Sequence, residues 1–307
     1  MINKIKSILI FCLIACSAVT VQAATLAYWN FEEGSGQNLT DISGNTIQEF
    51  IRGTSASDWM DPEWTEGIKG DHALKFMKLA APANGGVCSF INGYDPVLCS
   101  RALVATGSFT VEAFIKIDVM PADGYTDARY IVSLCDNSGT YASYWNYAIR
   151  LRTAGTDTFV EGLSRAKDGS WPTVTSTVAL STGVEYYVAF SYNADTMEAK
   201  IWVDNNTDTS TFAQQPISTD LTSPMFTIGA RRPSSSYSAF FEGVIDDVRV
   251  SDTVLTTQEM LSYGCGSIGY DPMDFNQDCR VDMADLAEFA KMWGNCSIPY
   301  LEGCDQY

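Results

Sequence analysis

Residues 274–285 carry oxygen-bearing side chains at a spacing that could surround one metal ion. Taken as a loop of about twelve residues, the stretch has side-chain oxygens at positions 1, 3, 5, 9 and 12, and the backbone carbonyl of position 7 adds a donor. In chain order the donors are Asp274, Asn276, Asp278, Arg280 (through its carbonyl), Asp282 and Asp285. Ca²⁺ takes about six to eight hard oxygen ligands, which this spacing places around one point. We therefore predict a calcium site here, with Ca²⁺ as the cofactor.

A helical pattern follows the calcium loop. Leu286, Phe289 and Trp293 recur at the spacing of one helix face. Loop and helix together resemble a dockerin repeat, and the departures include a single repeat and Cys279 at the loop position that is usually Gly. The resemblance implies that residues 265–307 form a calcium-dependent docking module, with a cohesin-like or other surface protein as its partner.

Aromatic and planar polar side chains gather between residues 141 and 152. A carbohydrate platform combines flat aromatic faces with polar groups that fix the orientation of the sugar. If the stretch is one strand, the odd-numbered residues from Trp145 to Leu151 face the core. The outward set, completed by a tryptophan in a later loop, is Tyr144, Asn146, Arg150, Arg152 and Trp171. We expect this set to bind a polysaccharide or a glycoprotein glycan, the alternative being that the aromatic residues fill the core.

Three further acidic stretches are candidates for metal binding. Asp41 and Asn45 lie in one turn, and Asp136 and Asn137 begin another. Asp246 lies in a strand-like segment and could ligate a second calcium ion. Hydrogen bonding within Asx turns explains the two turns equally well, so both interpretations stay open for them.

Short strand-like segments separated by turn residues must hold these side chains in place. The clearest segments are 109–117, 186–192, 200–203, 225–228 and 244–250. Regular short strands without helical patterns between them are typical of an antiparallel β-sandwich and argue against a parallel α/β sheet. After the last segment, Thr256 and Glu259 have the spacing of a capping box, which predicts a closing helix.

Five segments of the sandwich share a family pattern. They are LAYWNFEEGSG at 26–36, DISGN at 41–45, GDHALKF at 70–76, SFTVEAF at 108–114 and FEGVIDDVRV at 241–250. Together they resemble the laminin-G-like jelly-roll domains of the concanavalin A-like superfamily. The resemblance implies a jelly-roll sandwich with a binding function, whose ligand is a glycan or a protein.

The sequence gives little support to catalysis. His72 is the single histidine, so a Ser–His–Asp triad would depend on it, and His-rich zinc sites lack their ligands. Glycoside hydrolases with this sandwich place carboxylates at alternating strand positions, as Glu-x-Asp-x-x-Glu, and no such run is present. We therefore predict a protein that is not an enzyme. The alternatives are a glycoside hydrolase or lyase of the same fold, and a protein–protein scaffold with structural calcium only.

The N-terminus has the pattern of a secretory signal peptide. Lys4 and Lys6 precede an apolar run, which ends in the small-x-small cleavage site Val21–Ala23. Residues 13–16, LIAC, are similar to a bacterial lipobox, so a lipid on Cys16 is the alternative to free secretion. No later segment is apolar over about 18 residues, so we expect an extracellular or cell-surface protein without a membrane span. The predicted domains are a signal peptide (1–23), the sandwich (24–264) and the docking module (265–307).

The balance of charge is strongly acidic. The chain has 19 basic and 37 acidic residues, a net charge of −18, and two of the basic residues would leave with the signal peptide. Such a surface repels nucleic acid and anionic membranes. It also supplies oxygen ligands for Ca²⁺, so the charge agrees with the calcium prediction.

Seven of the nine cysteines follow the signal segment, and an exported chain would pair them. Four of these lie within residues 265–307, where disulfides could staple a segment too short for a large core. Four cysteines allow three pairings, which sequence alone does not distinguish. The pairs that we expect are Cys265 with Cys279, Cys296 with Cys304 and Cys88 with Cys99, which leaves Cys135 as the odd thiol.

Overall fold

The computed structural model describes most of the predicted sandwich and part of the C-terminal segment. The described residues are 25–36, 38–45, 50–51, 62–76, 87–88, 103–136, 145–166, 168–216, 221, 224–231 and 239–262, and then 273, 275, 281 and 283–292. The predicted signal peptide, with Cys16, lies outside these ranges. Within the described part, no helix is both long enough and apolar enough to cross a membrane.

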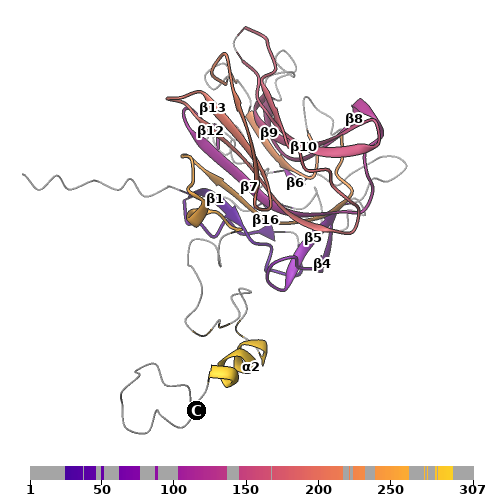
Figure 1. The fold of residues 1–307 in the computed structure, drawn as a ribbon, viewed down its shortest axis with the longest axis vertical. Coiled ribbons are helices and arrows are strands. Elements are labelled where there is room, and N and C mark those ends of the chain that lie inside the picture. Colours follow the sequence, from indigo (N-terminus) through magenta and orange to yellow (C-terminus); the bar gives the residue numbers. More distant parts are fainter. Residues whose placement is uncertain are drawn as a thin grey trace, which may run out of the picture.

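Two antiparallel sheets, called sheet A and sheet B here, form the domain (Figure 1). In spatial order, sheet A contains β14 (Asn206–Thr211), β13 (Glu198–Val203), β12 (Glu185–Asn193), β7 (Phe109–Ile117), β16 (Gly243–Ser251), β5 (His72–Phe76) and β4 (Glu63–Glu66), and β1 (Thr25–Trp29) also pairs with β16. Sheet B contains β11 (Thr173–Thr175), β10 (Asp157–Leu163), β9 (Trp145–Ala154), β8 (Gly124–Asp136), β15 (Pro224–Ile228), β6 (Val87–Cys88), β3 (Phe50–Ile51) and β2 (Asn38–Leu39). The predicted class, a mainly antiparallel β-sandwich, is confirmed.

The hydrophobic core lies between the two sheets. Most strands present apolar side chains to it at alternate positions, as the sequence pattern predicts, whereas β14 at the edge of sheet A has only polar residues. Trp29 of β1 stacks on Phe226 of β15 with ring centroids 5.3 Å apart, which joins sheet A to sheet B. Gly162 of β10 faces Phe190 of β12 so closely that a Cβ there would lie 2.4 Å from the Phe190 ring. The core is therefore packed at a density that admits no extra methyl group at this position.

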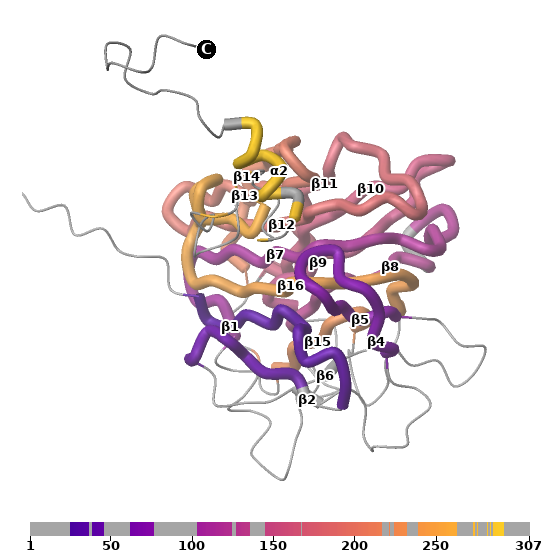
Figure 2. The backbone as a smooth tube through the Cα atoms, turned by 90° about the horizontal axis from the view of Figure 1, so that it is seen from below, coloured from indigo at the N-terminus to yellow at the C-terminus, as the bar shows by residue number. Residues whose placement is uncertain are grey.

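β16 occupies the centre of sheet A. One of its edges pairs with β7 over most of its length. The opposite edge is divided, because Gly243–Ile245 pairs with β5 and Val248–Ser251 pairs mainly with β1. Figure 2 shows β16 between β7 and the N-terminal strand β1. The last strand of the sandwich thus binds together strands from three distant parts of the chain.

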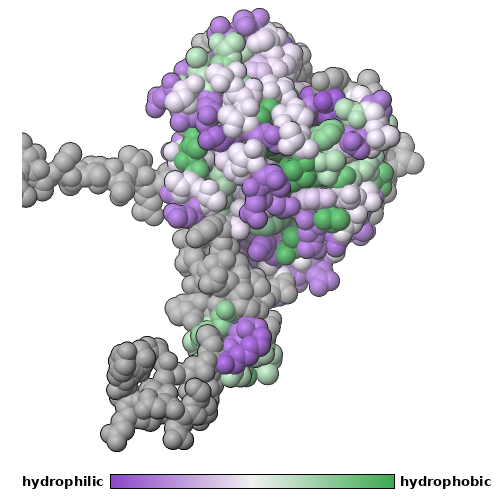
Figure 3. Space-filling model, in the orientation of Figure 1, coloured by the Kyte–Doolittle hydropathy of each residue, from purple (hydrophilic) through white to green (hydrophobic). Residues whose placement is uncertain are grey.

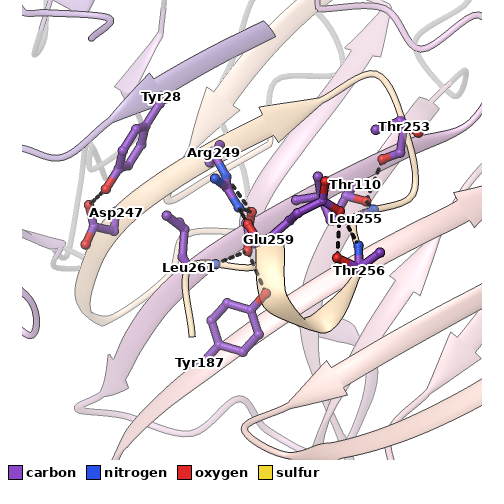
Figure 4. Close-up of polar contacts among 11 residues, drawn as sticks. Tyr28, Thr110, Tyr187, Asp247, Arg249, Thr253, Leu255, Thr256, Glu259 and Leu261 are labelled. Atoms are coloured by element: carbon purple, nitrogen blue, oxygen red, sulfur yellow. Dashed lines mark hydrogen bonds and ion pairs between the residues drawn. The ribbon is translucent and has the colours of Figure 1, made fainter. Parts of the chain in front are cut away.

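The segment after β16 covers the outer face of sheet A. It contains a single 3₁₀ turn, η1 (Thr257–Glu259), where the sequence predicted a longer helix. The predicted capping contact is present, since Glu259 Oε2 accepts hydrogen bonds from Thr256 N (2.8 Å) and Thr256 Oγ1 (2.7 Å) (Figure 4). The apolar residues buried beneath this segment are Phe114, Tyr187, Ala189, Trp202, Leu255, Met260 and Leu261. Further along the chain lies one helix, α2 (Met283–Met292), which begins within the last residues of the predicted calcium loop.

Candidate functional site

A one-residue bulge in β9 decides which side chains of this strand point away from the core between the sheets. Tyr147 lies opposite Leu134 of β8, whereas Trp145 lies opposite the next residue, Cys135. Asn146 is therefore the extra residue, and it changes the phase of the inward and outward alternation. Trp145 packs with Tyr130 in a cluster separate from the main core. The expectation that Trp145 faces the main core is wrong.

Asn146 was expected to point outward, and this is also wrong. Its side chain is completely buried. The Oδ1 atom accepts a hydrogen bond from Ala105 N (2.6 Å), and Nδ2 donates to Ala105 O (3.0 Å). The amide therefore pairs with the backbone of the segment before β7, as a neighbouring strand would. Asn146 holds the fold and is not available to a ligand.

Three aromatic rings lie in a row on the outer face of sheet B. Tyr130 and Trp145 have ring centroids 5.3 Å apart, and Trp145 and Trp171 have theirs 4.7 Å apart, both edge-on. The loop that carries Trp171 is held beside β9, because Arg165 N donates to Trp145 O at 2.9 Å. Trp171 itself is 41% exposed. It is the one aromatic among the large hydrophobic side chains that are exposed in the described part of the chain.

Guanidinium groups accompany these rings. Arg165 lies over Trp171, with Cζ 4.6 Å from the ring centroid. Arg231 lies over both Tyr130 and Trp145, at 5.6 Å and 5.3 Å. These distances are in the range of cation–π attraction. The rings therefore help to fix the position of both guanidinium groups.

A buried carboxylate neutralises two further arginines. Glu161 of β10 is 1% exposed. Arg150 Nε donates to Glu161 Oε2 (2.8 Å), and Arg152 Nε donates to Glu161 Oε1 (2.5 Å). Burial by itself lowers the pKa of Arg150, but Tyr130 and Glu161 raise it by more, so that Arg150 stays charged. We call the eight residues of this surface the aromatic–arginine face: Tyr130, Trp145, Arg150, Arg152, Glu161, Arg165, Trp171 and Arg231.

The aromatic–arginine face also contains a buried donor. Trp145 is 5% exposed, and its Nε1–H has no acceptor among the described residues. Buried donors are nearly always hydrogen-bonded in folded proteins, because an unmade bond costs about 1–3 kcal/mol. Burial raises the pKa of Tyr130, so its hydroxyl stays protonated at neutral pH. Because the indole and the phenol are buried, the half-buried guanidinium groups beside the exposed ring of Trp171 are the donors of this face that an oxygen-rich molecule could reach.

The structure does not bring the candidate ligands of a second metal site together. Asp41 Oδ1 accepts from Tyr28 N (2.8 Å) and Ser43 N (2.9 Å), while Asn45 donates to the carbonyl of Thr25. Asp246 lies in β16, where it accepts hydrogen bonds from backbone amides. Among the residues that the structure describes, no three His, Cys, Asp or Glu side chains are grouped so as to hold a metal ion.

Several predicted residues lie beyond the described ranges. Asp285 is described, and its side chain is 2% exposed in the first turn of α2. Cys135 is buried in β8, and Cys88 lies in β6. The predicted residues outside the described ranges are Asp274, Asn276, Asp278, Arg280, Asp282, Asn137, Tyr144, Cys99, Cys265, Cys279, Cys296 and Cys304, and the side chain of Asp136 is not described.

Sequence reasoning missed five members of the face: Tyr130, Trp145, Glu161, Arg165 and Arg231. Arg165 and Trp171 share one loop, and this proximity in the chain was an available signal. Tyr130 and Arg231 come from β8 and from the segment after β15, and pairing between distant strands brings them together. The alternation in β9 also failed as a guide, because the bulge depends on the partner strand.

Comparison with known proteins gives matches to solved structures and to one family model. No curated protein sequence matches the chain significantly. Among solved structures, a Trypanosoma rangeli sialidase has a TM-score of 0.50 at 14% identity, over 80% of this chain and 33% of that one. Domain 4 of AbnA, an extracellular arabinanase from Geobacillus stearothermophilus in complex with arabinotriose, has a TM-score of 0.48 at 19% identity, over 76% and 95%. The CBM40 of the Ruminococcus gnavus IT-sialidase, bound to α2,3-sialyllactose, has a TM-score of 0.44 at 17% identity, over 52% and 82%.

The likeness to the Trypanosoma rangeli sialidase concerns the fold alone, because the identity is 14%. The sequence profile Laminin_G_3, described as concanavalin A-like lectin/glucanases superfamily, matches residues 92–260. The match covers more than half of the chain and includes every strand that contributes to the aromatic–arginine face. The chain therefore belongs to the concanavalin A-like lectin/glucanases superfamily.

Proposed function

We propose that this chain is a non-catalytic carbohydrate-binding protein and that the aromatic–arginine face of sheet B is its binding site. The observation that carries the proposal is the half-exposed ring of Trp171, which lies beside the half-buried guanidinium group of Arg165. Sugars present apolar C–H faces and a rim of hydroxyl groups. A site that combines an aromatic surface with fixed polar donors suits both parts of such a ligand.

We favour binding over hydrolysis because Glu161 is buried and paired with two arginines. A glycosidase needs two carboxyl groups beside the scissile bond, one of them free to give or take a proton. Glu161 is the carboxylate of the aromatic–arginine face, and Arg150 and Arg152 hold it in ion pairs. Both of its oxygens accept hydrogen bonds from these arginines, so Glu161 is not placed to act on a glycosidic bond. Because the superfamily description names both lectins and glucanases, this chemistry decides our proposal rather than membership alone.

A calcium-dependent docking module at residues 265–307 completes the proposal. The predicted ligands are all oxygen donors, as Ca²⁺ prefers. Asp285, the last of them, is buried at the start of α2, the helix expected after the loop. The ion would hold the loop against this helix and would have a structural role. We further propose export through residues 1–23, to the medium or, with a lipid on Cys16, to the cell surface.

Retention on insoluble polysaccharides tests the main proposal. The full chain is expected to be retained without releasing reducing sugar. Trp171→Ala is expected to weaken the affinity by about tenfold or more, because a central aromatic contact is lost. Val184→Ala is the matched control, since Val184 is an exposed apolar residue (44%) immediately before β12, a strand of the other sheet. Equal retention of wild type and Trp171→Ala would refute this site, and release of sugar would favour the hydrolase.

A further inference from the structure

The aromatic–arginine face differs in charge from the rest of the chain. The whole chain has a net charge of −18. The eight residues of the face include four arginines and one carboxylate, Glu161. A further carboxylate, Asp168, lies near Arg165, where it is fully exposed to solvent. The face is thus a local cluster of positive charge on an acidic protein.

The four arginines divide into two kinds. Arg150 and Arg152 bind Glu161 on the strand surface, and their side chains are only 11% and 18% exposed. Arg165 and Arg231 are half-buried and lie over aromatic rings. Gly169, with φ +87°, keeps the loop close to Arg165, since a Cβ there would lie 3.2 Å from Arg165 Nη2. The loop therefore positions Arg165 beside Trp171 and leaves this arginine near the exposed ring.

Guanidinium groups recognise planar oxyanions in a specific way. Their N–H groups form a rigid fork that matches a carboxylate and binds sulfate or phosphate oxygens as well. Stacking on an aromatic ring fixes the fork in one orientation and reduces the entropy lost on binding. Arg165 and Arg231 both lie over rings of the same row of aromatic side chains, Arg165 over Trp171 and Arg231 over Tyr130 and Trp145.

We propose that the ligand of this face is an anionic glycan, whose carboxylate or sulfate groups bind Arg165 and Arg231 while a sugar ring packs on Trp171. This inference rests on the proposed carbohydrate-binding function and names its ligand class. Figure 3 shows that the side of the sandwich drawn there has hydrophilic residues among small groups of apolar ones. With a net charge of −18, the chain as a whole repels polyanions. Retention on an anionic glycan therefore has to come from local contacts.

The first step of the test is a glycan array that contains neutral, uronate-bearing, sialylated and sulfated glycans. The full chain is expected to bind acidic members preferentially. The strongest ligand is then compared by calorimetry with its own neutral form, which is prepared by carboxyl reduction or by desulfation. A loss of affinity on carboxyl reduction identifies a carboxylate as the recognised group, and a loss on desulfation identifies a sulfate.

Variants distinguish specific contacts from general attraction. Arg231→Gln and Arg165→Gln are each expected to weaken binding of the acidic glycan about tenfold, the effect of one charge-assisted hydrogen bond. Lys200→Gln is the control, because it removes one positive charge from sheet A, where Lys200 pairs with Glu198 at 2.8 Å. It should leave binding unchanged. An equal loss in all three variants would overturn the inference, since it would indicate charge attraction without a site.

Two other results separate this inference from the proposed function. Equal affinity for the charged and neutral forms, with binding lost in Trp171→Ala, would overturn the anionic ligand and leave carbohydrate binding in place. If the protein bound no glycan on the array, both the carbohydrate-binding function and the anionic ligand would be refuted.

Discussion

Arg249 and Glu112, on the neighbouring strands β16 and β7, form an ion pair that is almost fully buried, with side chains 2% and 1% exposed (Figure 4). Arg249 Nε donates to Glu112 Oε1 at 2.6 Å. The other oxygen, Oε2, accepts from the Tyr187 hydroxyl (2.6 Å) and from Leu261 N (2.9 Å). The Glu112 carboxylate of β7 thus connects this strand with β16, with β12 and with the segment that covers the outer face of sheet A.

Glu112→Gln is expected to lower the free energy of unfolding by about 3–5 kcal/mol, because it leaves the buried charge of Arg249 without its partner. The amide NH₂ group of the new glutamine would also face groups that donate hydrogen bonds to the Glu112 carboxylate. Urea unfolding followed by fluorescence measures the change. The control is Glu198→Gln, at an exposed ion pair with Lys200, where we expect a change within about 0.5 kcal/mol. Similar small changes in both variants would contradict the importance of this ion pair.

Asp246 and Asp247 form a second buried acidic pair in β16. Asp246 Oδ2 accepts from the backbone amides of Ile68 (2.8 Å) and Lys69 (2.9 Å), and Asp247 Oδ1 accepts from the Tyr28 hydroxyl (2.6 Å). Burial, followed by the charge of Asp247, raises the pKa of Asp246 to about 8. Burial also raises the pKa of Asp247 to about 6. The folded chain therefore keeps protons that the unfolded chain has already released.

This difference makes stability depend on pH. Below about pH 4 both states are protonated, and the pair has no effect. As pH rises from about 4 towards 8, the unfolded state holds fewer protons than the folded state, so the contribution to the free energy of unfolding falls. Asp247→Asn removes one of the two charges, keeps an acceptor for Tyr28, and suits the positive φ of +48° at this position. We expect a shallower decline in this variant.

Urea unfolding of both proteins at pH 5, 6, 7 and 8 gives the comparison. The difference between them is the informative quantity, since all other titrating groups are shared. The variant should gain stability relative to wild type as pH rises. Parallel curves would show that the pair does not titrate in this window.

Asn146 gives a third prediction. Asn146→Ala removes both hydrogen bonds to Ala105 and leaves a buried amide and carbonyl unpaired, which should cost about 2–4 kcal/mol of stability. Asn206→Ala, at the exposed start of β14, is the control. Because Trp145 is adjacent to the bulge, its fluorescence should also change. A stable variant with unchanged fluorescence would mean that Asn146 does not maintain the bulge.

The strands could be predicted from the sequence, since alternation and turn residues are local signals. The predicted segment 109–117 coincides with β7, and 244–250 falls within β16. The side of sheet B on which Trp145 lies could not be predicted, because the bulge at Asn146 arises from pairing with β8. Arg150 and Arg152 were expected on the outward face and lie there, but their partner Glu161 comes from β10. Tyr130 and Arg231 come from segments far apart in the chain, and their approach leaves no local signal in the sequence.

The calcium site makes a fourth prediction. Calorimetric titration of the oxidised protein with Ca²⁺ should show binding that is absent in an Asp274→Ala, Asp278→Ala double variant, because two charged ligands are lost. Asp195→Ala, a surface carboxylate in the turn before β13, serves as the control and should bind as wild type does. Wild type without binding would end the calcium proposal. Binding retained in the double variant would move the site to the sandwich.

The central place of β16 constrains how the chain can be made. β1 and β5 belong to the N-terminal part, yet the strand that joins them begins at Gly243. While the ribosome is still synthesising the middle of the domain, β1 and β5 have already been made, but their partner strand β16 has not. Sheet A can close only after Ser251 has emerged, so the domain should fold late and as a unit. Chains that end before Gly243 would present unpaired strand edges, and we expect them to aggregate rather than to persist as smaller folded domains.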